Sequence, residues 1–218
     1  MKRKINNFTL VEILTVIAII IILAGIAFPV VSIARSRGMV SKAQSEVSAI
    51  VTALKQMDAE YGKVLSKDNK IASVAVTVNG DIATLSKDNE TAYNAMIAEI
   101  SAPKSESFTK DSSPVKLSVN RKKRVFLEPQ KGFDPAKEYT SQTNMLYRDP
   151  WGNPYKIIIN VKRDDKLEVY TTPQKTIVGN YAVYSYGPNG KDDKGCNSNN
   201  AICGSDDCDH DDIASWDL

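Results

Sequence analysis

An uninterrupted apolar run near the amino terminus limits what this chain can fold into more than any other feature. No charged residue occurs between Ile13 and Ala34, a stretch of 22 residues that ends at Arg35. As an α-helix this run is roughly 33 Å long, close to the roughly 30 Å hydrocarbon core of a bilayer. The run therefore predicts a helix that spans a membrane.

Positive charge precedes the run. Residues 1–7 include Lys2, Arg3 and Lys4 and no acidic residue. Because positive flanks are retained in the cytoplasm, we expect everything after Arg35 to lie on the far side of the membrane. The run is longer than the apolar core of a secretory signal peptide, and no A-x-A pattern follows it, which disfavours a conventional cleaved signal.

Glu12 is a carboxylate within this otherwise apolar sequence. At the centre of a bilayer such a charge costs at least about 2.5 kcal/mol. One interpretation is an interfacial side chain that reaches the lipid headgroups. The other requires cleavage before Phe8. The new amino group then lies at a helix start, and Glu12 of one subunit could pair with the amine of a neighbour.

Residues 7–13 read NFTLVEI, which resembles the class III signal of type IV pilins and type II secretion pseudopilins. The resemblance implies cleavage between Asn7 and Phe8 by a prepilin peptidase, N-methylation of Phe8, and use of Glu12 in filament assembly. Asn7 departs from the family, which usually has glycine before the cut. Gly25 and Pro29 both weaken a helix, either as ordinary features of a membrane helix or as a soft point for filament packing.

Apolar residues continue at spacings of three and four from Val40 to Tyr61. This spacing predicts that residues 35–62 are the amphipathic half of one long helix, with Gly62 as its end. The whole helix would be roughly 80 Å long. Its apolar stripe needs a partner, which we expect the rest of the chain to provide.

Residues 63–148 are the least informative segment. The spacing predicts strands at Ile71–Val78 and Ile82–Leu85, and a helix at Glu90–Ile100. The basic run at residues 121–124 is either a patch for an acidic partner or, as we favour, a solvated loop. In the resembled family this segment is the variable connection between helix and sheet.

Residues 149–218 begin with a dense turn signal, DPWGNPY. Strand patterns follow at Tyr155–Val161, Leu167–Thr171 and Val178–Tyr186. Short strands with tight turns predict an antiparallel meander whose apolar face receives the stripe of the long helix. The fold class is therefore α+β.

Beyond Tyr186 the composition becomes acidic. Aspartates occur at eight positions after it: 192, 193, 206, 207, 209, 211, 212 and 217. Carboxylates and backbone carbonyls around a glycine-rich turn are the ligand set of Ca²⁺. The alternative is a solvated acidic tail, and the residues alone leave both open.

Three motifs resemble the carboxyl-terminal half of the major pseudopilin family of type II secretion: DPWGNPY at 149–155, YSYGPNG at 184–190 and DDIASW at 211–216. The resemblance implies a type IV pilin fold with a C-terminal Ca²⁺-binding loop. Lys191 stands where the family often has a ligand, and Asp192 or Asp193 could replace it. The other implied ligands are the Tyr186 carbonyl, Asn189, Asp211 and Asp212.

Cys196, Cys203, Cys208 and His210 lie within the same acidic segment. They could form a Cys₃His zinc site, but their spacing fits no common zinc motif. In an oxidising compartment we favour one disulfide with one cysteine left over. The sequence does not fix the pairing, of which Cys196–Cys203 is one possibility.

No nucleophile motif or phosphate-binding glycine loop is present in the sequence, so we do not expect an enzyme. Removing the leader lowers the formal charge from +2 to −1, which gives no reason to expect a nucleic-acid partner. The expected parts are a leader (1–7), a transmembrane half-helix (8–34), an amphipathic half-helix (35–62), a connection (63–148) and a sheet with its acidic loop (149–218).

The resemblance implies a structural subunit that polymerises from the inner membrane, with its C-terminal domain in the periplasm, into a pseudopilus for type II protein secretion. The implied partners are other copies of the chain, a prepilin peptidase, an inner-membrane assembly platform and minor pseudopilins. Two alternatives stay open. One is a type IV pilus pilin for adhesion, motility or DNA uptake, and the other is a membrane-anchored periplasmic domain that does not polymerise.

Overall fold

The computed structural model describes residues 9–65, 68–71, 74–101, 109–110, 113–114, 117–128, 147–169, 175–192 and 211–216. Within helix α1, the side chains of residues 26–30 are also outside the described part. The expectations for Asn7, Phe8, Asp193, Cys196 and Cys203 fall outside these residues. The chain divides into two compact units, Met1–Met39 and Val40–Leu218.

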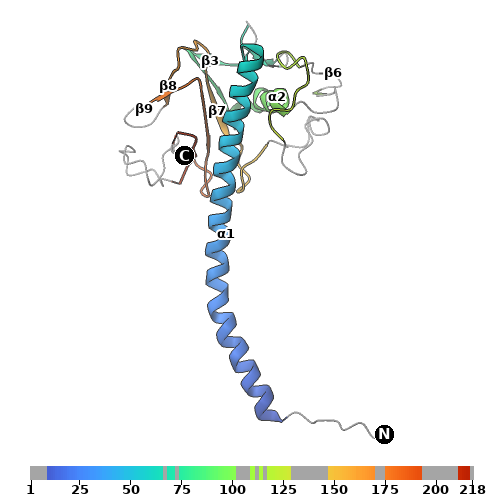
Figure 1. Cartoon of the computed structure of the whole chain (residues 1–218), viewed down its shortest axis with the longest axis vertical. Coiled ribbons are helices and arrows are strands. Elements are labelled where there is room, and N and C mark those ends of the chain that lie inside the picture. The colour runs from blue at the N-terminus through green and yellow to red at the C-terminus, as the bar shows by residue number, and fades with distance from the viewer. Residues whose placement is uncertain are drawn as a thin grey trace. The chain divides into compact units, whose positions relative to one another are not determined.

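The longest element is helix α1, which runs from Leu10 to Tyr61 without interruption (Figure 1). Its end is the predicted one: Gly62 has φ +69°, and its N–H donates to the Asp58 carbonyl at 2.7 Å. Glycine adopts this left-handed conformation without the strain that a side chain adds. The prediction of one long helix that ends at Gly62 is confirmed.

Among the residues that the structure describes, no helix is both long enough and apolar enough to cross a membrane. The membrane-spanning role expected for residues 8–34 stays a prediction, since Phe8 and the side chains of residues 26–30 lie outside the described part.

The main sheet has five antiparallel strands in the order β11-β10-β7-β4-β3. The central strand β7 (Lys156–Asn160) pairs with β4 (Ile82–Leu85) on one side and β10 (Tyr181–Ser185) on the other. The edges are β3 (Val78–Asn79) and the short β11 (Ile213–Ala214). The α+β class is thus correct, with strands from three distant parts of the chain.

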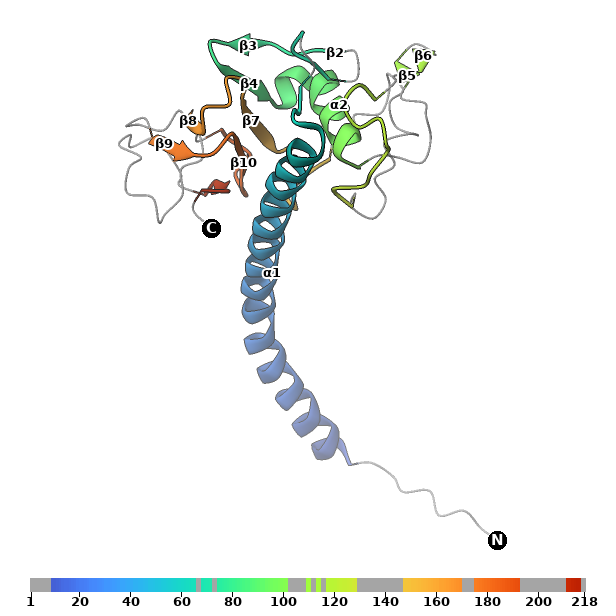
Figure 2. The same ribbon diagram turned by 45° about the horizontal axis from the view of Figure 1, so that its top comes forward.

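The predicted meander is wrong in its connectivity. β8 (Lys166–Val169) and β9 (Lys175–Val178) pair only with each other among the strands that the structure describes, as a separate ribbon (Figure 2). The predicted strand Val178–Tyr186 is split because Gly179 has φ +134°, which no extended strand accommodates. The neighbours of β7 are β4 and β10, whereas the predicted meander placed the strand at Leu167–Thr171 next to it.

The connecting segment contains further short elements. The predicted strand at Ile71–Val78 is instead a hairpin of β1 (Lys70–Ile71) and β2 (Val74–Ala75) followed by β3. A 3₁₀ turn (Lys87–Asn89) leads into helix α2, Glu90–Ser101, close to its predicted bounds. β5 (Thr109–Lys110) and β6 (Ser113–Pro114) form a small pair of strands.

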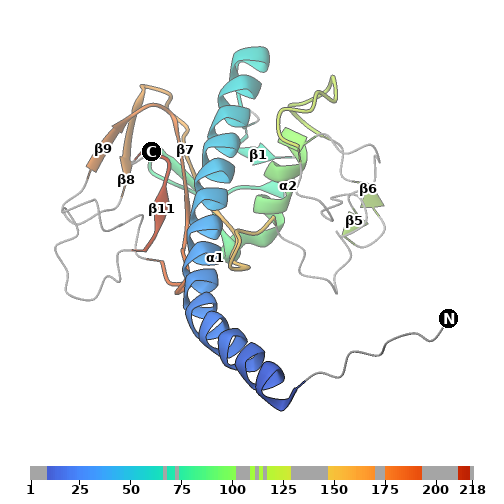
Figure 3. The ribbon, with the colours of Figure 1, turned by 60° about the horizontal axis from the view of Figure 1, so that its bottom comes forward.

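The core of the second unit forms around the carboxyl-terminal half of α1. In both Figure 1 and Figure 3, β7 lies on one side of this half-helix and α2 on the other. The predicted apolar stripe is buried against both, as expected for an amphipathic helix. Its fully buried members include Val47, Ile50, Leu54 and Met57, which pack in one cluster with residues such as Tyr93, Met96, Ile157 and Val183.

Candidate functional site

The amino-terminal part of α1 exposes most of the chain's large apolar surface. Of the fifteen large hydrophobic side chains that are exposed in the described part of the chain, thirteen lie in α1 before Arg35. They include five consecutive residues, Ile19 to Leu23, which cover every face of the helix. A helix that is apolar all round requires an apolar environment. Burial of this exposed apolar surface therefore requires contact with lipid or with other helices.

Glu12 lies at the start of this helix and caps it. Its Oε2 accepts hydrogen bonds from the Thr9 N–H and the Thr9 hydroxyl, both at 2.8 Å. The Glu12 N–H in turn donates to Thr9 Oγ1 at 3.2 Å. This reciprocal pair is a capping box, which satisfies donors that a helix start leaves open. The T-x-x-E pattern at residues 9–12 is the sequence signal by which this cap could have been predicted.

The predicted soft point does not interrupt the helix. α1 is continuous through Gly25 and through the backbone of Pro29. A Cβ built on Gly25 would meet nothing within 4 Å in this chain. Packing inside one subunit therefore gives no reason for glycine at this position, and a role in packing between subunits stays a prediction.

The second candidate site lies where the turn after β10 meets the strand β11. The turn spans residues 187–190, and its glycines have φ +64° and +68°. The Asn189 N–H donates to Asp211 Oδ2 at 3.0 Å. A Cβ on Gly187 would lie 2.9 Å from the Asp211 carbonyl carbon, so only glycine allows this close approach. The turn and Asp211 are therefore in direct contact, and the ion that the resemblance implies there stays a prediction.

A buried carboxylate holds the turn in place. Asp149, which is 5% exposed, accepts the Ser185 hydroxyl at 2.6 Å and the Asn153 N–H at 2.7 Å. Ser185 Oγ accepts the Gly187 N–H, and Asn153 Nδ2 donates to the Gly187 carbonyl. Burial raises the pKa of Asp149, while these hydrogen bonds act in the opposite direction. Residues of the DPWGNPY motif therefore hold the turn in place through hydrogen bonds.

Four of the implied ligands, Tyr186, Asn189, Asp211 and Asp212, lie just after β10 or just before β11, and Asn189 contacts Asp211. Asp212 is 1% exposed, so its charge has almost no access to water. The pKa values of two neighbouring tyrosines are affected by this negative charge. Burial first, and then the charges of nearby aspartates that include Asp192 and Asp212, raise the pKa of Tyr184 and of Tyr186. A buried carboxylate needs a counter-charge or hydrogen bonds, and a cation at the turn would supply one.

Asp192 is used differently from the expectation. Its carboxylate pairs with Lys156 Nζ at 2.6 Å and accepts the Tyr184 hydroxyl at 2.6 Å. Both Asp192 oxygens are therefore engaged by Lys156 and Tyr184. The Asn189 side-chain oxygen accepts the Lys191 N–H, also at 2.6 Å. The implied ligands are oxygen donors, which Ca²⁺ prefers. The Asp192 carboxylate, however, is already engaged by Lys156 and Tyr184.

No group of three or more His, Cys, Asp or Glu side chains arranged to hold a metal ion occurs in the ranges that the structure describes. A calcium site built from these residues would thus depend on backbone carbonyls and on Asn189 in addition to Asp211 and Asp212.

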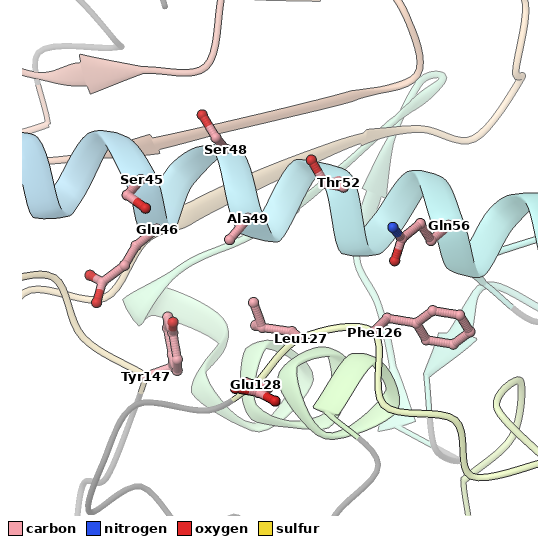
Figure 4. A pocket seen from close by; sticks show the side chains of 10 residues that line it. All are labelled: Ser45, Glu46, Ser48, Ala49, Thr52, Gln56, Phe126, Leu127, Glu128 and Tyr147. Carbon is pink, nitrogen blue, oxygen red and sulfur yellow. The ribbon is translucent and has the colours of Figure 1, made fainter.

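A groove of about 490 Å³ lies between α1 and the segment 126–128 (Figure 4). Glu46 contributes to its wall and accepts the Tyr155 hydroxyl. Small polar side chains dominate the helix side, and they do not identify a ligand. The lining residues are Ser45, Glu46, Ser48, Ala49, Thr52, Gln56, Phe126, Leu127, Glu128 and Tyr147.

Comparison of the chain with protein-family models, with curated proteins and with solved structures found no match. The resemblance to pilin-like proteins therefore rests only on the residues of the amino-terminal signal and of the three carboxyl-terminal motifs.

Proposed function

We propose that this protein is a structural subunit of a periplasmic pseudopilus, which polymerises from the inner membrane and drives type II protein secretion. Its work is mechanical, and the proposal assigns no catalytic residue. Subunits wait in the membrane, their amino-terminal helices bundle, and an assembly platform extrudes the growing filament.

The observation that carries this proposal is the exposed apolar helix headed by a single carboxylate. Thirteen large apolar side chains of α1 are exposed before Arg35. At about 25 cal/mol per Å² of buried apolar surface, leaving such a helix in water is strongly unfavourable. Lipid covers this apolar surface before assembly, and the helices of neighbouring subunits cover it afterwards.

Glu12 distinguishes a filament subunit from a simple anchor. A membrane anchor gains only the helix cap from a carboxylate near its start, whereas desolvating the charge is costly. Cleavage before Phe8 creates an amino group that can neutralise Glu12 of a neighbour. Both hydrogen bonds from Thr9 use the same oxygen, Oε2, so the cap is compatible with a charged partner.

The second part of the proposal is a Ca²⁺ ion at the turn of residues 187–190. Asp211, Asp212, Asn189 and the Tyr186 carbonyl would hold it, and it would supply positive charge next to the buried carboxylates. The hydrogen bonds by which Asp149 and Ser185 hold the turn in place support this proposal. The role of this arrangement is to make the periplasmic unit rigid enough for polymerisation.

The mature amino terminus tests the proposal. Intact mass of the protein from cells with a prepilin peptidase should show loss of residues 1–7 and the addition of one methyl group at Phe8. Protein from cells that lack the peptidase is the control and should retain the full mass. A chain that keeps residues 1–7 in both hosts would identify a plain membrane-anchored domain and reject the filament subunit.

A further inference from the structure

Two exposed arginines follow the apolar run of α1. Arg35 and Arg37 are both exposed, as is every other residue from Val31 to Gly38. Neither arginine forms a hydrogen bond or an ion pair within the part of the chain that the structure describes. A guanidinium carries five N–H donors and keeps its charge at physiological pH. Both side chains are therefore available to an anion from outside the described chain.

The distribution of charge along α1 leaves these two arginines uncompensated. No acidic residue occurs in the sequence between Glu12 and Glu46. The Glu46 carboxylate lies 3.7 Å from Lys42 Nζ, so the first acid after the apolar run is paired with the cation that follows the arginines. Neighbouring cations together create a stronger field for an anion than one cation alone. The segment from Arg35 to Arg37 is therefore the cationic end of the apolar helix.

Apolar side chains lie directly beside this charge. Val31 and Ile33 are 64% and 55% exposed, and Val31 precedes Arg35 by four residues. Residues four apart lie on the same face of a helix, one turn from each other. An arginine can therefore lay its apolar stem along this face while its guanidinium lies in a polar layer. The boundary between hydrocarbon and lipid phosphate provides both environments within one turn, whereas free phosphate in water provides only the anion.

The length of the helix agrees with such a boundary. Arg35 lies 23 residues beyond Glu12 in the continuous helix α1, which is about 34 Å along its axis. The hydrocarbon core of a bilayer is about 30 Å thick. With Arg35 at one phosphate layer, Glu12 lies close to the opposite interface, where its charge avoids the hydrocarbon. Arg37 is about 200° around the helix from Arg35, so each side chain reaches a different lipid.

We propose that Arg35 and Arg37 bind the phosphate groups of two anionic phospholipids on the periplasmic side of the inner membrane. Each guanidinium can donate two parallel hydrogen bonds to a phosphate. This site rests on the proposed function only for the position of α1 in the membrane, and it does not require polymerisation. Its role is to fix the depth of the helix, which keeps Glu12 at the interface where the amino group of a neighbour can reach it.

Spin-labelled lipids test this site in the full chain, reconstituted in phosphatidylcholine vesicles. Electron paramagnetic resonance measures how much spin-labelled phosphatidylglycerol the protein immobilises, relative to spin-labelled phosphatidylcholine. The variant Arg35→Gln with Arg37→Gln should lower this preference for the anionic lipid at least about twofold. The leader, residues 1–7, has the same charge in every variant, so the difference belongs to the two arginines.

The matched control is Lys55→Gln with Arg121→Gln, which removes the same charge at exposed positions. Lys55 lies 20 residues beyond Arg35 on α1, about 30 Å along the helix. Arg121 follows Asn120, whose side chain accepts the Tyr61 hydroxyl at the carboxyl end of α1. The control should keep the wild-type preference, because exposed charges further than about 10 Å apart are largely screened.

Three results would overturn the lipid site. The first is an equal preference in the wild type and the Arg35→Gln, Arg37→Gln variant. The second is loss of the wild-type preference in inorganic phosphate but not in chloride of the same ionic strength, which would mean that the arginines bind free phosphate. The third is loss of filaments in the variant with an unchanged lipid preference, which would assign the arginines to carboxylates of a second copy.

The lipid site and the filament subunit fail separately. A chain that keeps residues 1–7 in both hosts, and whose preference for phosphatidylglycerol depends on Arg35 and Arg37, rejects the filament subunit and retains the lipid site. A chain that is processed and methylated at Phe8, but shows no dependence on the two arginines, retains the filament subunit and rejects the lipid site.

Discussion

At the scale of single residues, Gly187 shows how a turn and a distant acid are brought together. It has φ +64°, and an added Cβ would press on the backbone of Asp211. Gly80 has almost the same φ, +61°, but a Cβ there meets nothing within 4 Å. The two positions thus separate conformational strain from steric contact.

We expect Gly80→Ala to cost about 1 kcal/mol, because only the left-handed backbone conformation is penalised. Gly187→Ala should cost at least about 2 kcal/mol, since the contact with Asp211 adds a packing penalty. Urea denaturation of both full-length variants in detergent measures the difference. Equal losses of stability would mean that the turn moves away from Asp211 without cost.

At the scale of secondary-structure elements, the sequence predicts helices better than strand partners. The bounds of α1 and α2 follow from local signals, namely the apolar spacing and a glycine stop. Strand order does not, because β4 and β7 are joined by contacts between residues far apart in the sequence. Gly179 is the local signal in the sequence that could have predicted the break between β9 and β10.

The candidate site was predicted to a similar extent. The motif resemblance implied Asn189 and Asp211 as ligands of one ion, and the structure shows a hydrogen bond between them, while the ion itself stays a prediction. The engagement of Asp192 by Lys156 could not be read from the sequence, because it depends on the register of β7 against β10. The support that Asp149 gives the turn is equally a product of tertiary structure.

The turn after β10 and strand β11 should depend on calcium for their stability. Chelation with EGTA should lower the melting temperature of the full chain by about 5–10 °C if the site is occupied a hundredfold above its dissociation constant. Asp212→Asn should remove this difference, because it deletes a buried ligand charge. Asp81→Asn, at an exposed aspartate between β3 and β4, is the matched control and should keep it. A wild-type chain indifferent to EGTA would be explained by a solvated acidic tail.

At the scale of the whole molecule, one carboxylate has two possible roles that the assembled filament would separate. Glu12 caps its own helix through Thr9, and in the proposal it also neutralises the amino group of a neighbour. The first role needs only a hydrogen-bond acceptor. The second needs a negative charge. Glutamine supplies the acceptor without the charge, and alanine supplies neither.

We therefore expect Glu12→Gln and Glu12→Ala both to abolish filaments, measured by shearing and pelleting, while both proteins remain in the membrane fraction. Thr9→Val is the matched control. It removes the hydroxyl of the cap, at a cost of about 0.5–2 kcal/mol to the helix start, but it keeps the charge of Glu12. This variant should still form filaments. If Glu12→Gln assembles as well as the wild type while Thr9→Val does not, the carboxylate serves its own helix, and the interaction that selects a neighbouring subunit must lie elsewhere in α1.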